Sequence, residues 1–286
     1  KRNGTIVKEP DYVSSDQFIL ASIHYYDGNP LFQTPNKNCS SHRDNSRIDL
    51  LTISEGYLPR TVYKLKNRHG IDIPFPENYY YAQRKRAQIS NERTLITAIQ
   101  PPGRVHTDNT YSIHFKDEFK MLVFASYSFS IIYDFYVKST GRENIYFDTV
   151  SNLPLFEVPC KYILSRSLHL TCLTNEYQEL WNSNKHYLPS QDCFSSNHAL
   201  LNGMKFHDSS ESWKFEISFK SEYVRRQALL EIDVLAAMHI GLTLDQLITI
   251  YSVVFGVLQS NEDKKVFDKN GRLVPTKVKD NLIKYT

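Results

Sequence analysis

Residues 79–115 read YYYAQRKRAQISNERTLITAIQPPGRVHTDNTYSIHF, and residues 121–141 read MLVFASYSFSIIYDFYVKSTG. The β-branched run Thr94–Gln100 predicts a strand, which the following Pro-Pro-Gly ends because two prolines cannot continue a ladder. The alternating run Tyr111–Phe115 predicts the returning strand. Apolar residues at three- and four-residue spacing predict one helix over Met121–Lys138.

The chain after this stretch has a different character. A short segment, Ile145–Phe156, follows Gly141 and contains Leu-Pro-Leu. Helical spacing returns over Leu168–Trp181, and Trp213–Phe219 alternates like a strand. Two further helices belong together: Tyr223–His239, and a second one over residues 243–258 that opens on a capping-box pattern, Thr243 followed three residues later by Gln246.

These patterns predict an α+β fold. We expect a small mixed sheet with packed helices, followed by a mostly helical C-terminal region. The predicted units are an N-terminal linker or docking segment over residues 1–56, a recognition domain over residues 57–160, and the helical region over residues 161–286.

Amino-acid composition limits the classes of protein to which this chain can belong. The 286 residues are 41% hydrophobic, which is enough for a packed core. The net charge of +3 does not by itself imply nucleic acid. The four scattered cysteines form no Cys-x-x-Cys pair, which favours a reducing compartment, so we expect a cytoplasmic protein. No apolar run is long enough to predict a membrane span.

Positive charge is concentrated in one part of the chain. Residues 57–93 contain eight Lys or Arg residues and three acidic residues. A local excess of this kind suits contact with DNA phosphates, and an ordinary solvated face is the alternative. The predicted phosphate contacts are Arg60, Lys64, Lys66, Arg84, Lys85 and Arg86.

The loop after Pro-Pro-Gly offers side chains that suit base edges. Arginine pairs with guanine and asparagine with adenine, and an ordinary surface turn is the alternative reading. The predicted contacts to bases or backbone are Arg104, His106 and Asn109 in this loop, with Arg142 and Asn144 after the helix.

Catalytic and cofactor motifs are absent from the sequence. It contains no glycine-rich nucleotide or S-adenosylmethionine loop, no P-loop and no His-Glu-x-x-His. Cysteine and histidine spacings do not suit zinc. Glu231 and Asp233 do not face each other if they lie on a helix, so we expect no carboxylate dyad there. We predict no catalytic, cofactor or metal site in this chain, and a self-contained nuclease is disfavoured.

The order of several short motifs resembles one enzyme family. These are Asn91-Glu92-Arg93-Thr94 with the run to Pro-Pro-Gly, the helix that ends at Gly141, the Leu-Pro-Leu segment, Arg226–Ala236 with Gly241–Tyr251, and Asp268–Val274. Together they are similar to the long adenine-N6 DNA methyltransferases of the type IIG restriction–modification and phage-defence (BREX- and DISARM-like) class of bacteria.

The resemblance implies a function for the parent protein. It would transfer a methyl group from S-adenosylmethionine to adenine N6, and would also cut or exclude foreign DNA. This chain would be its C-terminal specificity region, similar to the target recognition domains of type I specificity subunits and inactive alone. Its partners would be double-stranded DNA and the N-terminal methyltransferase domain that holds the cofactor. The resemblance supports Arg93 and Gly141 as framework more than as base contacts, and Arg93 is also counted among the predicted DNA-binding residues.

A second hypothesis belongs to another class. The helical hairpin over residues 223–258 would dock a partner protein, and the basic stretch would be plain surface. Salt-insensitive binding to a protein, without binding to DNA, would favour this reading.

Overall fold

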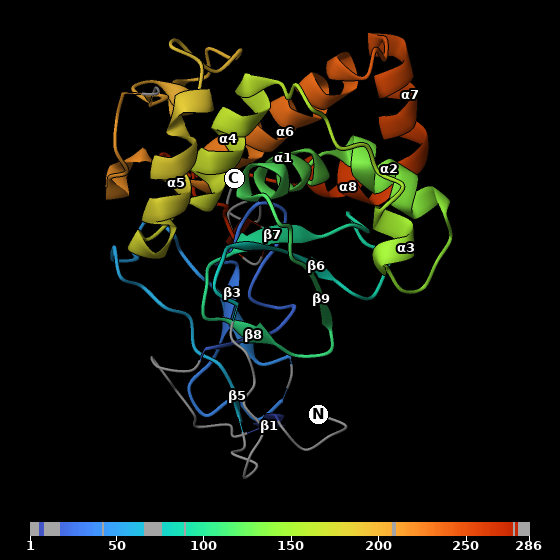
Figure 1. The fold of residues 1–286 in the computed structure, drawn as a ribbon. Coiled ribbons are helices and arrows are strands. Elements are labelled where there is room, and N and C mark those ends of the chain that lie inside the picture. The colour runs from blue at the N-terminus through green and yellow to red at the C-terminus, as the bar shows by residue number, and fades with distance from the viewer. Residues whose placement is uncertain are drawn as a thin grey trace.

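The computed structural model describes residues 6–8, 18–41, 43–65, 76–88, 90–207, 210–276 and 278–279. Within these residues the fold is mixed α+β, with eight α-helices and four small sheets. The helices gather in one layer, and the strands lie below them in the view of Figure 1. The expected fold class is confirmed at this level.

A three-stranded antiparallel sheet lies directly under the helices. Its central strand β6 (Tyr80–Arg84) pairs with β7 (Thr97–Gln100) on one side and with β9 (Thr110–Ile113) on the other. All four residues of β7 are buried, and so are the first four of β6. The two strands predicted around the Pro-Pro-Gly turn are therefore present, each shorter than expected.

The remaining strands are short and join distant parts of the chain. The antiparallel pairs are β1 (Ile6–Lys8) with β5 (Tyr63–Leu65) and β3 (Gln33–Pro35) with β4 (Asn45–Arg47), and the parallel pair is β2 (Ile19–Leu20) with β8 (Val105–His106). Phe18, Leu20 and Tyr25 pack against Tyr80 and Ala82 of β6. Residues near the start of the chain therefore cover the face of the sheet that the helices leave free.

The helix predicted over Met121–Lys138 is two helices in the structure, α1 (Glu118–Ser128) and α2 (Ile131–Ser139). The break lies at Phe129 and Ser130. The Ser130 side chain caps α2, and its hydroxyl also donates to the carbonyl of Tyr127. A serine that bonds nearby backbone groups in this way ends one helix and starts another, so the prediction of one continuous helix was wrong.

Helix α4 (Lys161–Thr171) and helix α5 (Gln178–Asn184) replace the single helix predicted over Leu168–Trp181. A 3₁₀ turn, η1 (Asn175–Tyr177), leads into α5. The short helix α3 (Phe147–Val150) occupies part of the segment before Pro154. Apolar spacing located these helices, but it did not show where the chain turns between them.

The two C-terminal helices confirm the sequence pattern in most respects. Helix α6 (Glu222–His239) buries Val224, Ala228, Ile232 and Ala236, as expected. The capping box is present at the start of α7 (Leu244–Val254). The expected single helix to Leu258 breaks at the buried Phe255, and α8 (Gly256–Glu262) follows.

Trp213–Phe219 is not a strand, although its pattern alternates. Its centre is a 3₁₀ turn, η4 (Phe215–Ile217), and Trp213, Ile217 and Phe219 are buried. The N–H of Phe219 donates to the carbonyl of His169 at the end of α4. The backbone of this segment therefore pairs with a helix end, so alternating burial arises here without a sheet.

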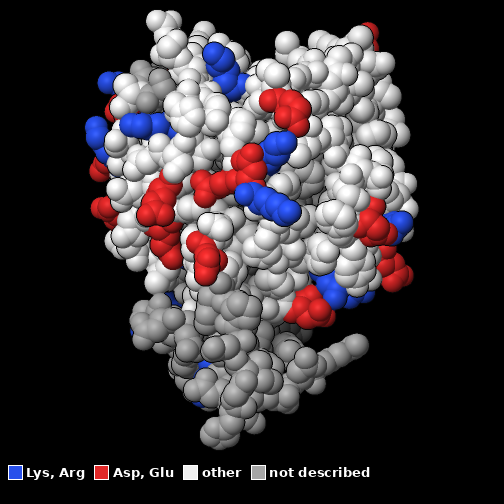
Figure 2. Space-filling view, viewed as in Figure 1, with Lys and Arg blue, Asp and Glu red and all other residues white. Residues whose placement is uncertain are grey.

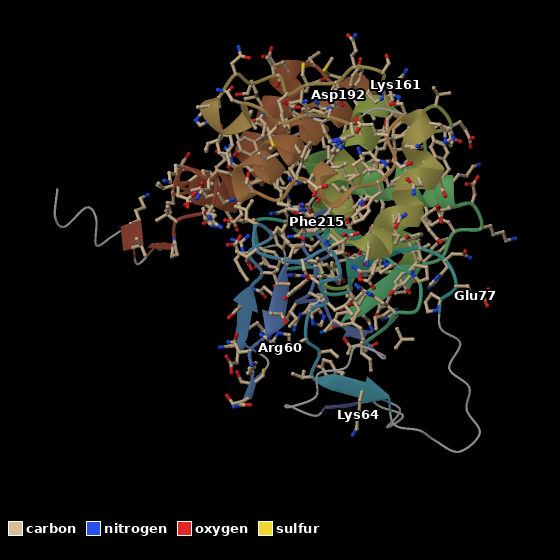
Figure 3. All side chains as sticks on the ribbon, turned by 90° about the vertical axis from the view of Figure 1, so that its left-hand side faces the viewer. Arg60, Lys64, Glu77, Lys161, Asp192 and Phe215 are labelled. Carbon is tan, nitrogen blue, oxygen red and sulfur yellow. The ribbon has the colours of Figure 1, made fainter. Side chains whose placement is uncertain are left out.

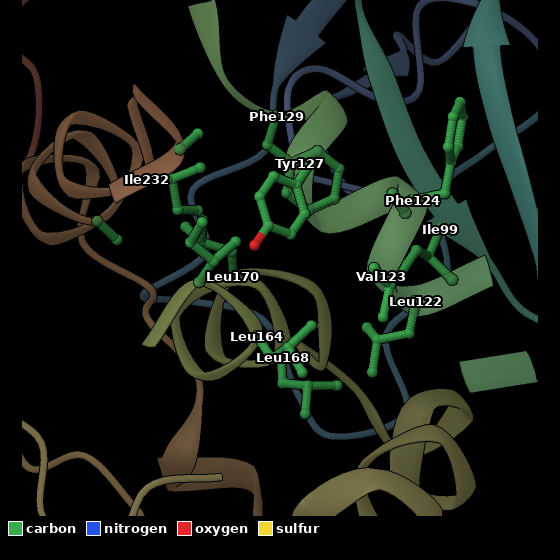
Figure 4. Close-up of a cluster of buried hydrophobic side chains, with 14 of the residues drawn as sticks. Ile99, Leu122, Val123, Phe124, Tyr127, Phe129, Leu164, Leu168, Leu170 and Ile232 are labelled. Atoms are coloured by element: carbon green, nitrogen blue, oxygen red, sulfur yellow. The ribbon is translucent and has the colours of Figure 1, made fainter. Parts of the chain in front are cut away.

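The main hydrophobic core lies between the sheet and the helices. Figure 4 shows Leu122, Val123, Phe124 and Tyr127 of α1 meeting leucines of α4, Ile232 of α6 and Ile99 of β7. Contributors come from both sides of residue 160, where the sequence suggested a boundary. No helix of the described residues is long and apolar enough to cross a membrane.

Candidate nucleic-acid interface

An open groove forms where the chain leaves β6 and where it leaves α2. Its volume is about 520 Å³, and it is lined by Arg86, Ala87, Gln88, Ser90, Asn91, Gly141, Arg142 and Glu143. Backbone bonds hold the two segments together: the N–H of Ala87 donates to the carbonyl of Glu143 (2.9 Å), and that of Ile145 to the carbonyl of Lys85 (2.8 Å). Gly141 takes the positive φ that the turn after α2 requires.

The groove brings together three of the predicted contacts. Arg86 pairs through its backbone with Asn144, and Arg142, two residues before Asn144, lines the groove together with Arg86. Arg86 is exposed, and no described carboxylate lies within ion-pair distance of it. Arg142 is also exposed but forms an ion pair with Asp148. The groove therefore offers the guanidinium of Arg86, unpaired among the described residues, the paired guanidinium of Arg142 and the acid Glu143.

Two amide side chains that line the groove, those of Gln88 and Asn91, were not predicted as site residues from the sequence. The Nδ2 of Asn91 donates to the Oε1 of Gln88 at 2.6 Å, which orients both amides. Amides of this kind offer both donors and acceptors to a ligand. Their signal in the sequence is that Gln88 and Asn91 follow closely after the basic triplet Arg84–Arg86.

Lys85 lies beside the groove and is already paired. Its ammonium contacts Asp108 at 2.8 Å and lies 5.4 Å from the ring centre of Tyr146. The hydrogen bond to Asp108 raises the pKa of Lys85 above its ordinary value. At the surface such a pair contributes little stability and is open to exchange with phosphate.

Two predicted contacts are buried and require correction. Arg104 has only 2% of its surface exposed and forms an ion pair with Glu176, while Tyr80 donates to its carbonyl. Arg93 is 6% exposed and lies between Asp27 (3.5 Å) and Asp233 (3.3 Å). These guanidiniums hold the fold together, so neither reaches a base or a phosphate.

Other predicted contacts are engaged with the protein's own backbone. The Nε of Arg60 donates to the carbonyl of Pro35 at 2.7 Å, and a terminal nitrogen of Arg84 donates to the carbonyl of Tyr25 at 3.1 Å. Figure 3 shows Arg60 and Lys64 in the lower, strand-bearing part of the molecule. Lys66 lies outside the described residues.

His106 and Asn109 also serve local structure. The His106 ring bonds the carbonyl of Thr107 (3.0 Å) and the hydroxyl of Ser112 (2.9 Å), and burial lowers its pKa. The Oδ1 of Asn109 accepts from the N–H of Ser22 at 3.2 Å. Sequence spacing predicted the loop but not these internal partners, which for His106 are near in sequence and for Asn109 include the distant Ser22.

Charge is mixed over the visible surface. Figure 2 shows acidic and basic side chains interspersed on this face, without one continuous basic patch. Among the described arginines of residues 57–93, Arg93 is buried, and the side chains of Arg60 and Arg84 donate to backbone carbonyls. Within the described residues, no group of three or more His, Cys, Asp or Glu side chains is placed to hold a metal ion.

Comparison of the chain with protein-family models, with curated proteins and with solved structures found no match.

Proposed function

We propose that this chain recognises DNA as the specificity region of an adenine-N6 DNA methyltransferase of a restriction–modification or phage-defence system. The observation that carries the proposal is the groove: segments about Arg86 and Arg142, far apart in sequence, bring two guanidiniums to two oriented amides. Guanidiniums suit phosphates and guanine, and amides suit adenine. The methyl-transfer chemistry and S-adenosylmethionine are assigned to a catalytic domain outside this chain.

The groove suggests a division of roles. Arg86, which has no ion-pair partner among the described carboxylates, contacts a phosphate oxygen. Arg142 exchanges Asp148 for the nucleic acid, which costs little because both partners of that pair are half-exposed. Gln88 and Asn91 then present amides to base edges. The acid Glu143 disfavours phosphate nearby and so helps to fix the register of the bound strand.

Fluorescence-anisotropy titration with duplex DNA at about 50 and 200 mM salt tests this proposal, since phosphate contacts weaken over that range. Arg86→Ala should weaken binding to all sequences alike and lower the salt slope by about one. Lys161→Ala is the matched control, because it removes one exposed positive charge at the start of α4, at the top of Figure 3. Equal losses for both variants, or no binding at low salt, would contradict the assignment.

A second candidate function is docking of a protein through α6 and α7. Exposed apolar residues follow one side of this hairpin: Leu230, Val234, Met238, Ile240, Leu244 and Ile248. Met238 is 65% exposed and Leu244 67%. Between Asp233 and Glu262 the only Lys, Arg, Asp or Glu is Asp245. The apolar pattern of α7 leaves Leu244 and Ile248 exposed in the structure, which supports an interaction surface.

The partner that this face fits best is a second copy of the chain. A two-fold axis would oppose apolar side chains without bringing like charges together. Sedimentation equilibrium should then show a concentration-dependent dimer that is insensitive to salt. Met238→Glu with Ile248→Glu should abolish the dimer, whereas Met204→Glu, at an exposed loop methionine, should not. A monomer at every concentration would exclude this candidate.

A further inference from the structure

Two exposed aromatic side chains follow closely in sequence after Gly141, Arg142 and Glu143, which line the groove. Phe147 is 57% exposed and Tyr146 is 41% exposed, at the start of α3. Contacts on both sides tie them to the groove. Arg142 of the groove pairs with Asp148, the residue after Phe147, and the Lys85 ammonium lies 5.4 Å from the Tyr146 ring.

The two rings differ in how firmly they are held. Tyr146 packs edge-on against Tyr111 of β9, at 5.8 Å between ring centres and 88° between planes. The Phe147 ring packs against no aromatic ring of the other described residues, and more than half of its surface is exposed to solvent. Tyr146 is therefore held in place by Tyr111, whereas the ring of Phe147, the next residue, is exposed to solvent.

Single exposed apolar residues are ordinary on protein surfaces. What sets this pair apart is its neighbourhood, since Lys85, Arg86 and Arg142 all lie on the same two chain segments. Cations and rings also occur at protein interfaces, but there they need not follow a regular backbone of charges. A nucleic-acid strand with unstacked bases suits this combination of cations and rings, because cations follow the phosphates while aromatic faces replace the lost base stacking.

We infer that the groove and its aromatic rim bind an unpaired nucleotide, with the base stacked on Phe147 and its phosphate at Arg86. The site would accordingly prefer single-stranded or locally opened DNA to a closed duplex, whose bases stay stacked and cannot reach a ring. This inference rests on the proposed function, because it places nucleic acid in the same groove.

The test compares binding of a labelled single strand, the matching duplex, and that duplex carrying one extra unpaired adenine. The chain should bind the single strand and the bulged duplex more tightly than the closed duplex. Phe147→Ala should weaken binding to those two by about tenfold, the size of one lost base–aromatic stack, and should change closed-duplex binding little. Phe147→Trp should restore the preference.

Two controls separate stacking from other causes. Phe147→Leu keeps an apolar side chain but removes the π face, so it should behave like Phe147→Ala. Tyr162→Ala removes an aromatic ring of similar exposure on α4 and should leave every affinity unchanged. A 2-aminopurine in the bulge should lose fluorescence on binding to the wild-type chain and keep it with Phe147→Ala.

The outcomes distinguish the two proposals. If binding depends on Arg86 but closed duplex is preferred, or if Phe147→Leu is silent, the unpaired-nucleotide site is wrong and DNA recognition at the groove stands. Equal losses on all three DNAs for Phe147→Ala also exclude stacking. If none of the three DNAs binds, both proposals fail together.

Discussion

At the scale of single residues, Arg93 joins segments from across the chain. Its guanidinium lies between Asp27, near the start, and Asp233, on α6. The other oxygen of Asp233 accepts from the N–H of Ile131 at the start of α2, at 2.7 Å. Asp134 on α2 accepts from the N–H groups of Thr94 and Leu95. One buried cation thus organises three buried carboxylates and the backbone that they cap.

Replacing Arg93 should therefore damage the fold rather than DNA affinity. Arg93→Ala leaves buried carboxylates without their counter-charge, and breaking a buried pair in this way costs about 3–5 kcal/mol. Arg86→Ala, at an exposed arginine, should change the free energy of unfolding by less than about 0.5 kcal/mol. Urea denaturation of both variants makes the comparison. Similar midpoints would show that the Arg93 cluster contributes nothing to stability.

The same cluster should make stability depend on pH. Burial raises the pKa of Asp27 to about 7, although Arg93 opposes this, and Asp134 and Asp233 raise it further. Burial likewise raises the pKa of Asp134 to about 6. Because both values exceed the ordinary 3.8, the folded state holds protons that the unfolded state releases. Stability from these groups is complete below about pH 4 and is lost as pH rises through 6 and 7.

Asp27→Asn tests this direction, because the amide resembles the protonated acid. The wild-type free energy of unfolding should fall relative to the variant by up to about 1.4 kcal/mol per pH unit between about pH 4 and 7. Urea titrations at a series of pH values supply the difference between the two proteins. A difference that stays constant, or that widens in favour of the wild type as pH rises, would mean that Asp27 is ionised in the folded state.

At the scale of elements, local signals predicted well wherever one helix satisfied its own backbone. Helix α6 and the capping box of α7 depend on spacing and on residues three apart, so the sequence alone located both. The turn at Phe129 combines the local cap of Ser130 with a distant bond from the N–H of Ile131 to Asp233, and the 3₁₀ segment at Phe215–Ile217 is followed by a distant bond from Phe219 to His169. Sequence periodicity contains no record of those partners.

The predicted site residues show the same difference between positions set by local structure and positions set by distant partners. Arg86, Arg142 and Asn144 come together because two loops pair through their backbones, and the predicted strand and helix placed those loops at element ends. Arg93 and Arg104 looked equally available in the sequence. Their burial follows from carboxylates supplied by Asp233 and Glu176, which lie 140 and 72 residues further along the chain.

The end of the chain braces the start of α6 through one glycine. Gly271 has φ +74, its carbonyl accepts from the N–H of Tyr223, and an added Cβ would lie 2.9 Å from the hydroxyl of Ser221, the cap of α6. Gly271→Ala should therefore destabilise more than Gly103→Ala, which shares the positive φ but has open space around it. Positive φ costs each alanine about 1 kcal/mol. Equal denaturation midpoints would show that the contact with Ser221 relaxes freely.

At the scale of the whole molecule, the two candidate interfaces use different parts of the fold. The groove lies at the ends of β6 and α2, whereas the exposed apolar side chains lie on α6 and α7. Figure 1 places α7 at the top of the helical layer and α3, beside the groove, below it near the edge of the sheet. A chain that recognises DNA and also pairs with a second copy can therefore use both surfaces without competition.

The shared core predicts how the chain behaves when it is divided at the expected boundary. Residues Met121–Ser128 of α1 are all buried, with the sheet on one side and α4 on the other. A fragment that ends at Cys160 loses α4 and α6, so buried α1 side chains such as Met121, Leu122 and Tyr127 would face water and Arg93 would lose Asp233. Each large apolar side chain exposed in this way costs about 1.5–3 kcal/mol, and a few of them exceed the stability of a typical domain. We therefore expect no cooperative urea transition and little near-ultraviolet circular dichroism from this fragment, while the full chain shows both. A fragment that instead unfolds cooperatively, with a dispersed amide spectrum, would establish residues up to 160 as an independent domain whose sheet finds other cover.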